Sequence, residues 1–204
     1  MDTIFVHLSS SSLDWKKARI FEVAGIRIAD NGEREGSTFD RINQDAEFET
    51  TSQLLEFGFS VKAWQDAIPL SSALSTLSRT LVDGRIGKYV VVAHGAARQQ
   101  SLLMSECERL NLVNPFEGRA WICTEQLAWP MAVAGLVTAR RLSVVCQYWN
   151  LDLPDTPNAA DTVNALAELY RSMMKRYTLL LSAEQTARDM TGGLFGQLGK
   201  VLGL

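Results

Sequence analysis

The two histidines of this 204-residue chain, together with one of its carboxylates, are the first candidates for metal binding or proton transfer. His7 lies in an apolar run, and His94 follows a second one at a turn of small residues. With Asp161 they could bind one transition metal ion, because imidazole and carboxylate groups are common ligands. Their spacing matches no metal-binding motif. We therefore favour structural roles, in which His94 hydrogen-bonds to the backbone and Asp161 caps a helix.

Serine and cysteine chemistry receives less support from the sequence. The serine tract of residues 9–12 has no glycine and no neighbouring base, so it predicts a solvated turn instead of a nucleophile or a phosphate loop. The three cysteines are odd in number and widely spaced. They indicate neither a disulfide framework nor a zinc site, and they favour a reducing, cytoplasmic location.

The apolar pattern predicts an α/β fold. Strands are expected at residues 3–8, 19–28, 35–42, 90–92 and 119–124, with a hairpin turn at residues 30–32. Helices are expected at residues 70–82, after the turn at His94, and at residues 125–134, 142–149 and 163–177. Asp83-Gly84 is expected to end the first helix, and Pro130 to break or kink the helix that contains it.

Several of these segments resemble the DnaQ-like (DEDDh) 3′–5′ exonucleases. VVVAHGAARQ at residues 90–99 is similar to their VAHNAAFD segment, and PNAADTV at residues 157–163 is similar to HNALDDV. Residues 3–9 take the place of the strand that carries FDLETTGLD, and Phe57-Gly58-Phe59 that of a short connecting turn. The resemblance covers about residues 3–177. It implies an RNase H-like mixed sheet flanked by helices, with a domain at residues 1–178 and a tail at 179–204.

The same resemblance implies that the family's catalytic residues are replaced. The family holds two divalent metal ions with four carboxylates and uses a histidine as general base. The carboxylate positions fall on His7, Ser9, Gln99 and Thr162, and the base position on Pro157. Neutral ligands cannot compensate for the dehydration of paired Mg²⁺ ions, so we expect neither a bound metal nor another cofactor.

The sequence therefore favours a catalytically inactive exonuclease relative that acts by binding single-stranded nucleic acid or a protein. Two alternatives stay open: an active Mg²⁺- or Mn²⁺-dependent exonuclease with rebuilt ligands, and a structural subunit of a larger assembly. The net charge of −3 indicates no basic field over the whole molecule. The residues expected to line a binding site are His7, Ser9, Ser10, His94, Gln99 and Asp161.

The C-terminal tail is the last feature that the sequence singles out. If helical, it places Leu194, Phe195, Leu198, Val201 and Leu202 on one stripe, but it also contains five glycines, which oppose an isolated helix. We predict that it orders only against another surface, either a second copy or a partner; packing on its own domain is the alternative. We expect no signal peptide and no membrane span.

Overall fold

The computed structural model describes residues 1–12, 14, 16, 18–43, 66–82 and 89–202, with the backbone alone for residue 181 and residues 183–202. The chain divides into two compact units, Met1–Glu168 and Leu169–Leu204. The first unit contains the sheet and all of the residues expected to form a site. No helix within these described ranges has the length and apolar character that crossing a membrane requires.

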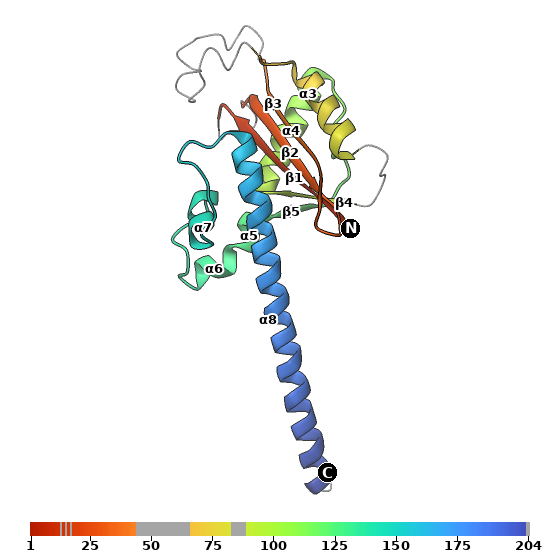
Figure 1. Ribbon diagram of the computed structural model, residues 1–204, viewed down its shortest axis with the longest axis vertical. Coiled ribbons are helices and arrows are strands. Elements are labelled where there is room, and N and C mark those ends of the chain that lie inside the picture. The colour runs from red at the N-terminus through yellow and green to blue at the C-terminus, as the bar shows by residue number, and fades with distance from the viewer. Residues whose placement is uncertain (13, 15, 17, 44–65, 83–88, 203–204) are drawn as a thin grey trace. The chain divides into compact units, whose positions relative to one another are not determined.

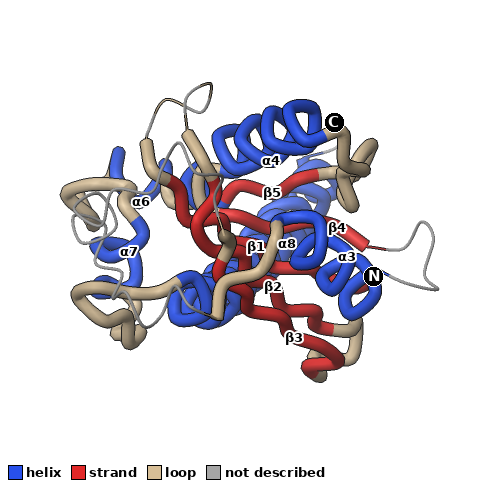
Figure 2. Tube along the Cα trace, turned by 90° about the horizontal axis from the view of Figure 1, so that it is seen from above, coloured by secondary structure: helices blue, strands red, loops and turns tan. Residues whose placement is uncertain are grey.

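The first unit is built on a five-stranded mixed sheet in the order β3-β2-β1-β4-β5 (Figures 1 and 2). β1 (Asp2–Ser10), β2 (Ile20–Ile28) and β3 (Arg34–Arg41) are antiparallel. β4 (Tyr89–Ala93) and β5 (Trp121–Cys123) extend the sheet in parallel with β1. The expected mixed sheet is confirmed, but β1 runs further than predicted. Ser9 and Ser10 belong to the strand and are partly buried, so the prediction of a solvated turn there is wrong.

Helices α3 (Leu70–Leu77) and α4 (Ala96–Leu110) share one core with the sheet. Alternate residues of β1 point toward these helices because successive strand residues face opposite sides. The cluster joins residues of β1, α3 and α4: Ile4, Val6, Leu8, Leu74, Leu77, Leu102 and Leu103. The helix expected at residues 70–82 is confirmed, with its last turn wound as the π-helix η2 (Ser78–Val82). Its expected end at residues 83–84 and the motif at residues 57–59 lie outside the described residues.

The remaining helices follow β5. Two short helices, α5 (Thr124–Leu127) and α6 (Trp129–Val133), replace the single helix expected at residues 125–134. Pro130 lies in the first turn of α6, where a backbone N–H has no acceptor within the helix and its absence costs nothing. The break predicted at Pro130 is confirmed. α7 (Leu142–Tyr148) agrees with expectation.

The last helix, α8 (Ala159–Leu202), is longer than predicted, with 44 residues. The expectation that it ends near Tyr177 is wrong. Its sequence has neither glycine nor proline between residues 159 and 191, so nothing in the backbone chemistry stops it at that point. Residues 159–168 belong to the first compact unit, and residues 169–202 to the second.

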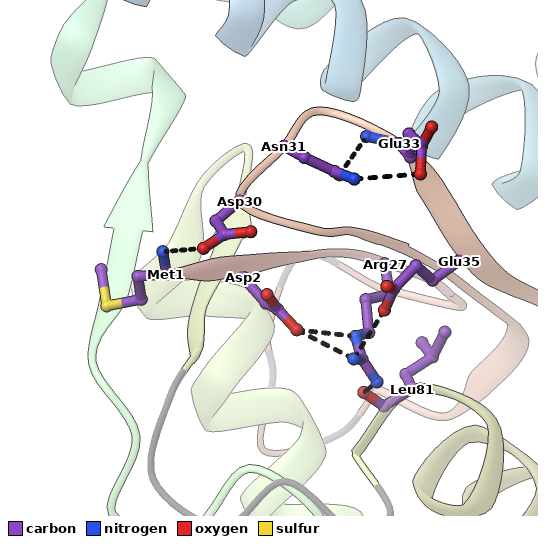
Figure 3. Close-up of polar contacts among 8 residues, drawn as sticks. All are labelled: Met1, Asp2, Arg27, Asp30, Asn31, Glu33, Glu35 and Leu81. Carbon is purple, nitrogen blue, oxygen red and sulfur yellow. Dashed lines mark hydrogen bonds and ion pairs between the residues drawn. The ribbon is translucent and has the colours of Figure 1, made fainter.

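An ion cluster around the buried Arg27 ties η2 to the sheet (Figure 3). The guanidinium of Arg27, which is 7% exposed, donates to Asp2 Oδ2 at 3.1 and 2.8 Å and to Glu35 Oε2 at 2.7 Å. Its Nη1 also reaches the Leu81 carbonyl at 3.4 Å. These contacts join three strands to the end of η2. The close approach of η2 requires glycine in β3, because a Cβ on Gly36 would lie 3.0 Å from the Thr80 carbonyl oxygen.

Candidate functional site

The expected site begins on one face of β1. His7 and Ser9 lie on the same side of the strand because they are two residues apart. In the sheet register His7 lies opposite Ala24 of β2, and Ser9 opposite Glu22. Glu22 in turn lies opposite Arg41 of β3. A row of polar residues therefore crosses three strands at the end of β1.

Glu22 is the centre of this row, and it is only 2% exposed. Its Oε2 accepts hydrogen bonds from Ser9 Oγ at 3.2 Å and from the Ala159 N–H at 2.9 Å. Its Oε1 lies 3.6 Å from Arg41 Nε. Ala159 is the first residue of α8, where backbone N–H groups have no acceptor within the helix and the helix dipole favours a negative charge. We call this group the Glu22 clasp: Ser9, Glu22, Arg41 and the Ala159 amide.

Gln99 occupies the position at which the resemblance expects a metal-binding aspartate. It follows Gly95, whose φ of 67° turns the chain from β4 into α4. The Gln99 amide is 2% exposed and pairs with the main chain of Leu8: Oε1 accepts from the Leu8 N–H at 2.8 Å, and Nε2 donates to the Leu8 carbonyl at 3.3 Å. The parallel pairing of β1 with β4 stops at Phe5 and Val92. The side chain of Gln99 thus supplies Leu8 with hydrogen bonds beyond the end of that pairing.

The start of α8 holds Pro157 and Thr162, the other two positions at which the resemblance expects catalytic residues. Asn158 and Asp161 cap the helix reciprocally: the Asn158 N–H donates to Asp161 Oδ2 at 3.2 Å, and the Asp161 N–H donates to Asn158 Oδ1 at 2.8 Å. Thr162 Oγ1 donates to the Asn158 carbonyl at 2.9 Å, and Pro157 is exposed. The predicted capping role of Asp161 is confirmed.

His94 also has the structural contact predicted for it. Its Nε2 lies 2.8 Å from the Arg140 carbonyl, and its Nδ1 lies 3.0 Å from Thr124 Oγ1. Because a carbonyl only accepts, Nε2 carries the proton, and in the neutral ring Nδ1 accepts from the threonine hydroxyl. Burial lowers the pKa of His94 and so favours this neutral form. The ring connects the end of β4 to α5 and to the loop that precedes α7.

A cation, Arg98, lies near His7 at the end of β1. Arg98 Nη2 donates to Ser10 Oγ at 2.7 Å and to the Ser12 carbonyl at 2.9 Å, which brings the first turn of α4 to the end of β1. Burial, and then the positive charge of Arg98, lowers the pKa of His7 to about 4. The imidazole of His7 is therefore neutral at pH 7. We call His7, Ser10, Ser12 and Arg98 the Arg98 group.

These residues do not fit a pair of divalent metal ions. Mg²⁺ and Mn²⁺ require several anionic oxygen ligands, and Glu22 is the carboxylate at this end of β1. The oxygen of Gln99 already accepts from Leu8, and the Thr162 hydroxyl is bonded to its own helix. In the part of the chain that the structure describes, no three His, Cys, Asp or Glu side chains form a group that could hold a metal ion.

The structure brings together most of the residues that the sequence singled out. His7, Ser9, Ser10 and Gln99 meet at the end of β1, and the Glu22 clasp joins this region to the start of α8. Sequence reasoning missed Glu22, Arg41 and Arg98. For Glu22 the available signal was a charged residue between the apolar residues Phe21 and Val23 of β2, which implies burial against a partner.

Comparisons with known proteins establish the fold. No protein-family model matches the sequence, and no curated protein sequence matches it. Solved structures do match. The nuclease domain of 3′hExo, a DEDDh family member bound to rAMP, is similar with a TM-score of 0.66 at 13% identity over 86% of this chain and 92% of that chain.

Two further nucleases agree with this result. Exonuclease I of E. coli, in complex with a dT13 oligonucleotide, has a TM-score of 0.69 at 12% identity over 92% of this chain and 44% of that chain. The cell-death related nuclease 4 (CRN-4) has a TM-score of 0.69 at 10% identity, over 86% of this chain and 64% of that one. The chain therefore has the RNase H-like fold of the DnaQ-like, DEDDh exonucleases, as its sequence motifs predicted.

Proposed function

We propose that this chain is a non-hydrolysing member of the exonuclease fold that binds single-stranded nucleic acid without cleaving it. The observation that carries the proposal is the state of Gln99. The resemblance expects a metal-binding carboxylate at this position. Instead, the oxygen and the nitrogen of a neutral side-chain amide both hydrogen-bond to the main chain of Leu8. A residue committed in this way stabilises the fold and is not available to a metal ion.

The charge of the site supports binding. Arg98 lies at the end of β1 against Ser10 and Ser12, and a guanidinium binds phosphate oxygens directly, with charge-assisted hydrogen bonds. The neutral imidazole of His7 adds a hydrogen-bonding group without adding negative charge. The similar structure of exonuclease I contains a dT13 oligonucleotide, and a further similar structure concerns recognition of the histone mRNA stem-loop by a 3′-exonuclease. We extend nucleic-acid binding to this chain on the strength of the site.

The proposal is tested with end-labelled single-stranded DNA and RNA. We expect no release of mononucleotides in Mg²⁺ or Mn²⁺, and binding that persists in EDTA. Arg98→Gln should weaken binding, whereas the matched control Arg34→Gln, an exposed arginine on the edge strand β3, should not. Metal-dependent hydrolysis that survives repurification would instead support an exonuclease with rebuilt ligands. If the chain binds neither the DNA nor the RNA in EDTA, the proposal is refuted.

A role for α8 in association is a second candidate. Leu179 and Leu180 are 62% and 57% exposed, and Met174 is 40% exposed. Exposed apolar side chains on a long helix favour a contact with a second copy or a protein partner. We propose that residues 183–204 complete this contact. Sedimentation of the full chain and of a chain ending at Ser182 tests the idea, and identical mass and identical captured partners would contradict it.

A further inference from the structure

Helix α6 and the turn after it expose three large apolar side chains within eight residues. Trp129, Val133 and Leu136 are 55%, 70% and 48% exposed, and they are spaced by four and three residues. Met131 and Val137, between and after them, are buried. Trp129 and Val133, four residues apart, share one exposed face of α6, and Leu136 follows the helix after Gly135, whose φ is 70°. We call Trp129, Val133 and Leu136 the α6 patch.

A cation covers part of this patch and connects it to the site. The guanidinium carbon of Arg140 lies 4.8 Å from the centroid of the Trp129 ring, and Arg140 Nη1 lies 3.7 Å from Glu125 Oε1. The Arg140 carbonyl accepts the hydrogen bond from His94. A short series of contacts thus leads from His94 through Arg140 to the aromatic ring.

The size of the patch limits what it can bind by itself. Three partly exposed side chains provide a few hundred Å² of apolar surface. A stable protein–protein interface buries roughly 800 Å² on each partner. One flat aromatic ligand needs far less, and Trp129 stays more than half exposed with Arg140 in place.

We propose that the α6 patch is a base-stacking subsite for single-stranded nucleic acid. A nucleobase stacks on the indole of Trp129, Val133 and Leu136 border it with apolar surface, and Arg140 provides positive charge for the phosphate backbone. Aromatic side chains interleaved with arginines are the usual chemistry of single-strand binding without sequence preference. The inference rests on the proposed function and adds to it a contact outside the former catalytic residues.

The test uses the full chain and fluorescence anisotropy in EDTA with two labelled ligands, an oligothymidylate and an abasic oligomer of equal length. Trp129→Ala should weaken oligothymidylate binding about tenfold, within the range expected when one stacked base is lost. Trp129→Phe should keep most of the affinity because it retains an aromatic face. Val113→Ala, a matched control at an apolar residue that is 84% exposed, should leave the affinity unchanged. On the abasic oligomer, Trp129→Ala should bind as the wild type does.

Each other outcome overturns a defined part of the argument. Oligothymidylate binding by Trp129→Ala equal to that of the wild type rejects the subsite and leaves the proposed function standing. An equal loss on both ligands rejects stacking. If the wild type self-associates with increasing concentration and Trp129→Ala abolishes this association, the patch is an interface between copies of the chain. Failure of the wild type to bind either ligand rejects the proposed function together with the subsite.

Thermal unfolding of each variant shows whether it is folded at the assay temperature. Trp129→Leu is the second variant, because it keeps an apolar side chain in place and removes only the aromatic face. It should lose oligothymidylate affinity as Trp129→Ala does. Trp129→Leu with full affinity would reject the subsite independently of any effect of alanine on folding.

Discussion

Replacing Gln99 tests how much its buried side-chain contacts stabilise the fold. Its amide makes two hydrogen bonds, at 2.8 and 3.3 Å, to the N–H and carbonyl of Leu8, and the residue is 2% exposed. Gln99→Leu would leave both Leu8 groups without these partners in a buried position. Each buried polar group left unsatisfied costs about 1–3 kcal/mol, so we expect the free energy of unfolding to fall by about 2–5 kcal/mol.

Gln99→Glu separates hydrogen bonding from charge. The ionised carboxylate can still accept from the Leu8 N–H but cannot donate to its carbonyl, and it adds a buried negative charge. Burial should raise the pKa of the new carboxyl above its ordinary value of about 4.3. The folded state favours the protonated form of Glu at this position. The free energy of unfolding of Gln99→Glu should therefore approach that of the wild type when the pH is below about 4.3, the ordinary pKa of the carboxyl. Relative stability should then fall as the pH rises through the raised folded pKa.

Urea denaturation followed by circular dichroism, at several pH values between 4 and 8, provides the measurement. Gln100→Glu is the matched control, because Gln100 is the next residue of α4 and is exposed. It should show neither the large loss nor its pH dependence. The reasoning is refuted if Gln99→Leu unfolds within about 0.5 kcal/mol of the wild type, the scatter of ordinary surface substitutions. It is also refuted if Gln99→Glu is equally destabilised at pH 4 and pH 8.

Four further predictions concern other parts of the chain. Between pH 6.5 and about 4, His7 is protonated in the unfolded chain but neutral in the folded one, so the free energy of unfolding should decrease as the pH is lowered through this range. His7→Asn should reduce this pH dependence in urea titrations. Arg27→Met should cost about 2–3 kcal/mol by chemical denaturation, less than the 3–5 kcal/mol of a fully buried pair because its carboxylates reach solvent. Gly36→Ala should cost about 1–2 kcal/mol in the same assay, because its Cβ would crowd the Thr80 carbonyl. Removal of residues 183–204 should leave the melting temperature of the core nearly unchanged in calorimetry while altering the sedimenting mass; a large drop in melting temperature would show that the tail stabilises the core.

The segments that resemble the exonuclease motifs illustrate how much local patterns can predict. The turn at Gly95 and the start of α8 at Asn158 were recognisable because turns and helix starts have local patterns that survive substitution. The same reasoning predicted the contacts of His94 and Asp161, since turns and helix caps depend on residues close in sequence. The prediction for residues 9 and 10 was wrong, because a polar tract is typical of a turn and its partners across the sheet are not visible in the local sequence.

The sequence by itself determined the order of the strands and helices and the mixed α/β class. Only the tertiary structure decided how the polar residues near the end of β1 are paired. Glu22 meets Ser9 across 13 residues and Ala159 across 137 residues, and Gln99 meets Leu8 across 91 residues. The alternation of apolar residues along a strand shows which face of the sheet each side chain occupies. It does not show how the partner strand is aligned with it or where a helix packs on the sheet. Those depend on packing of the whole core, and the pairing of buried polar groups follows from it.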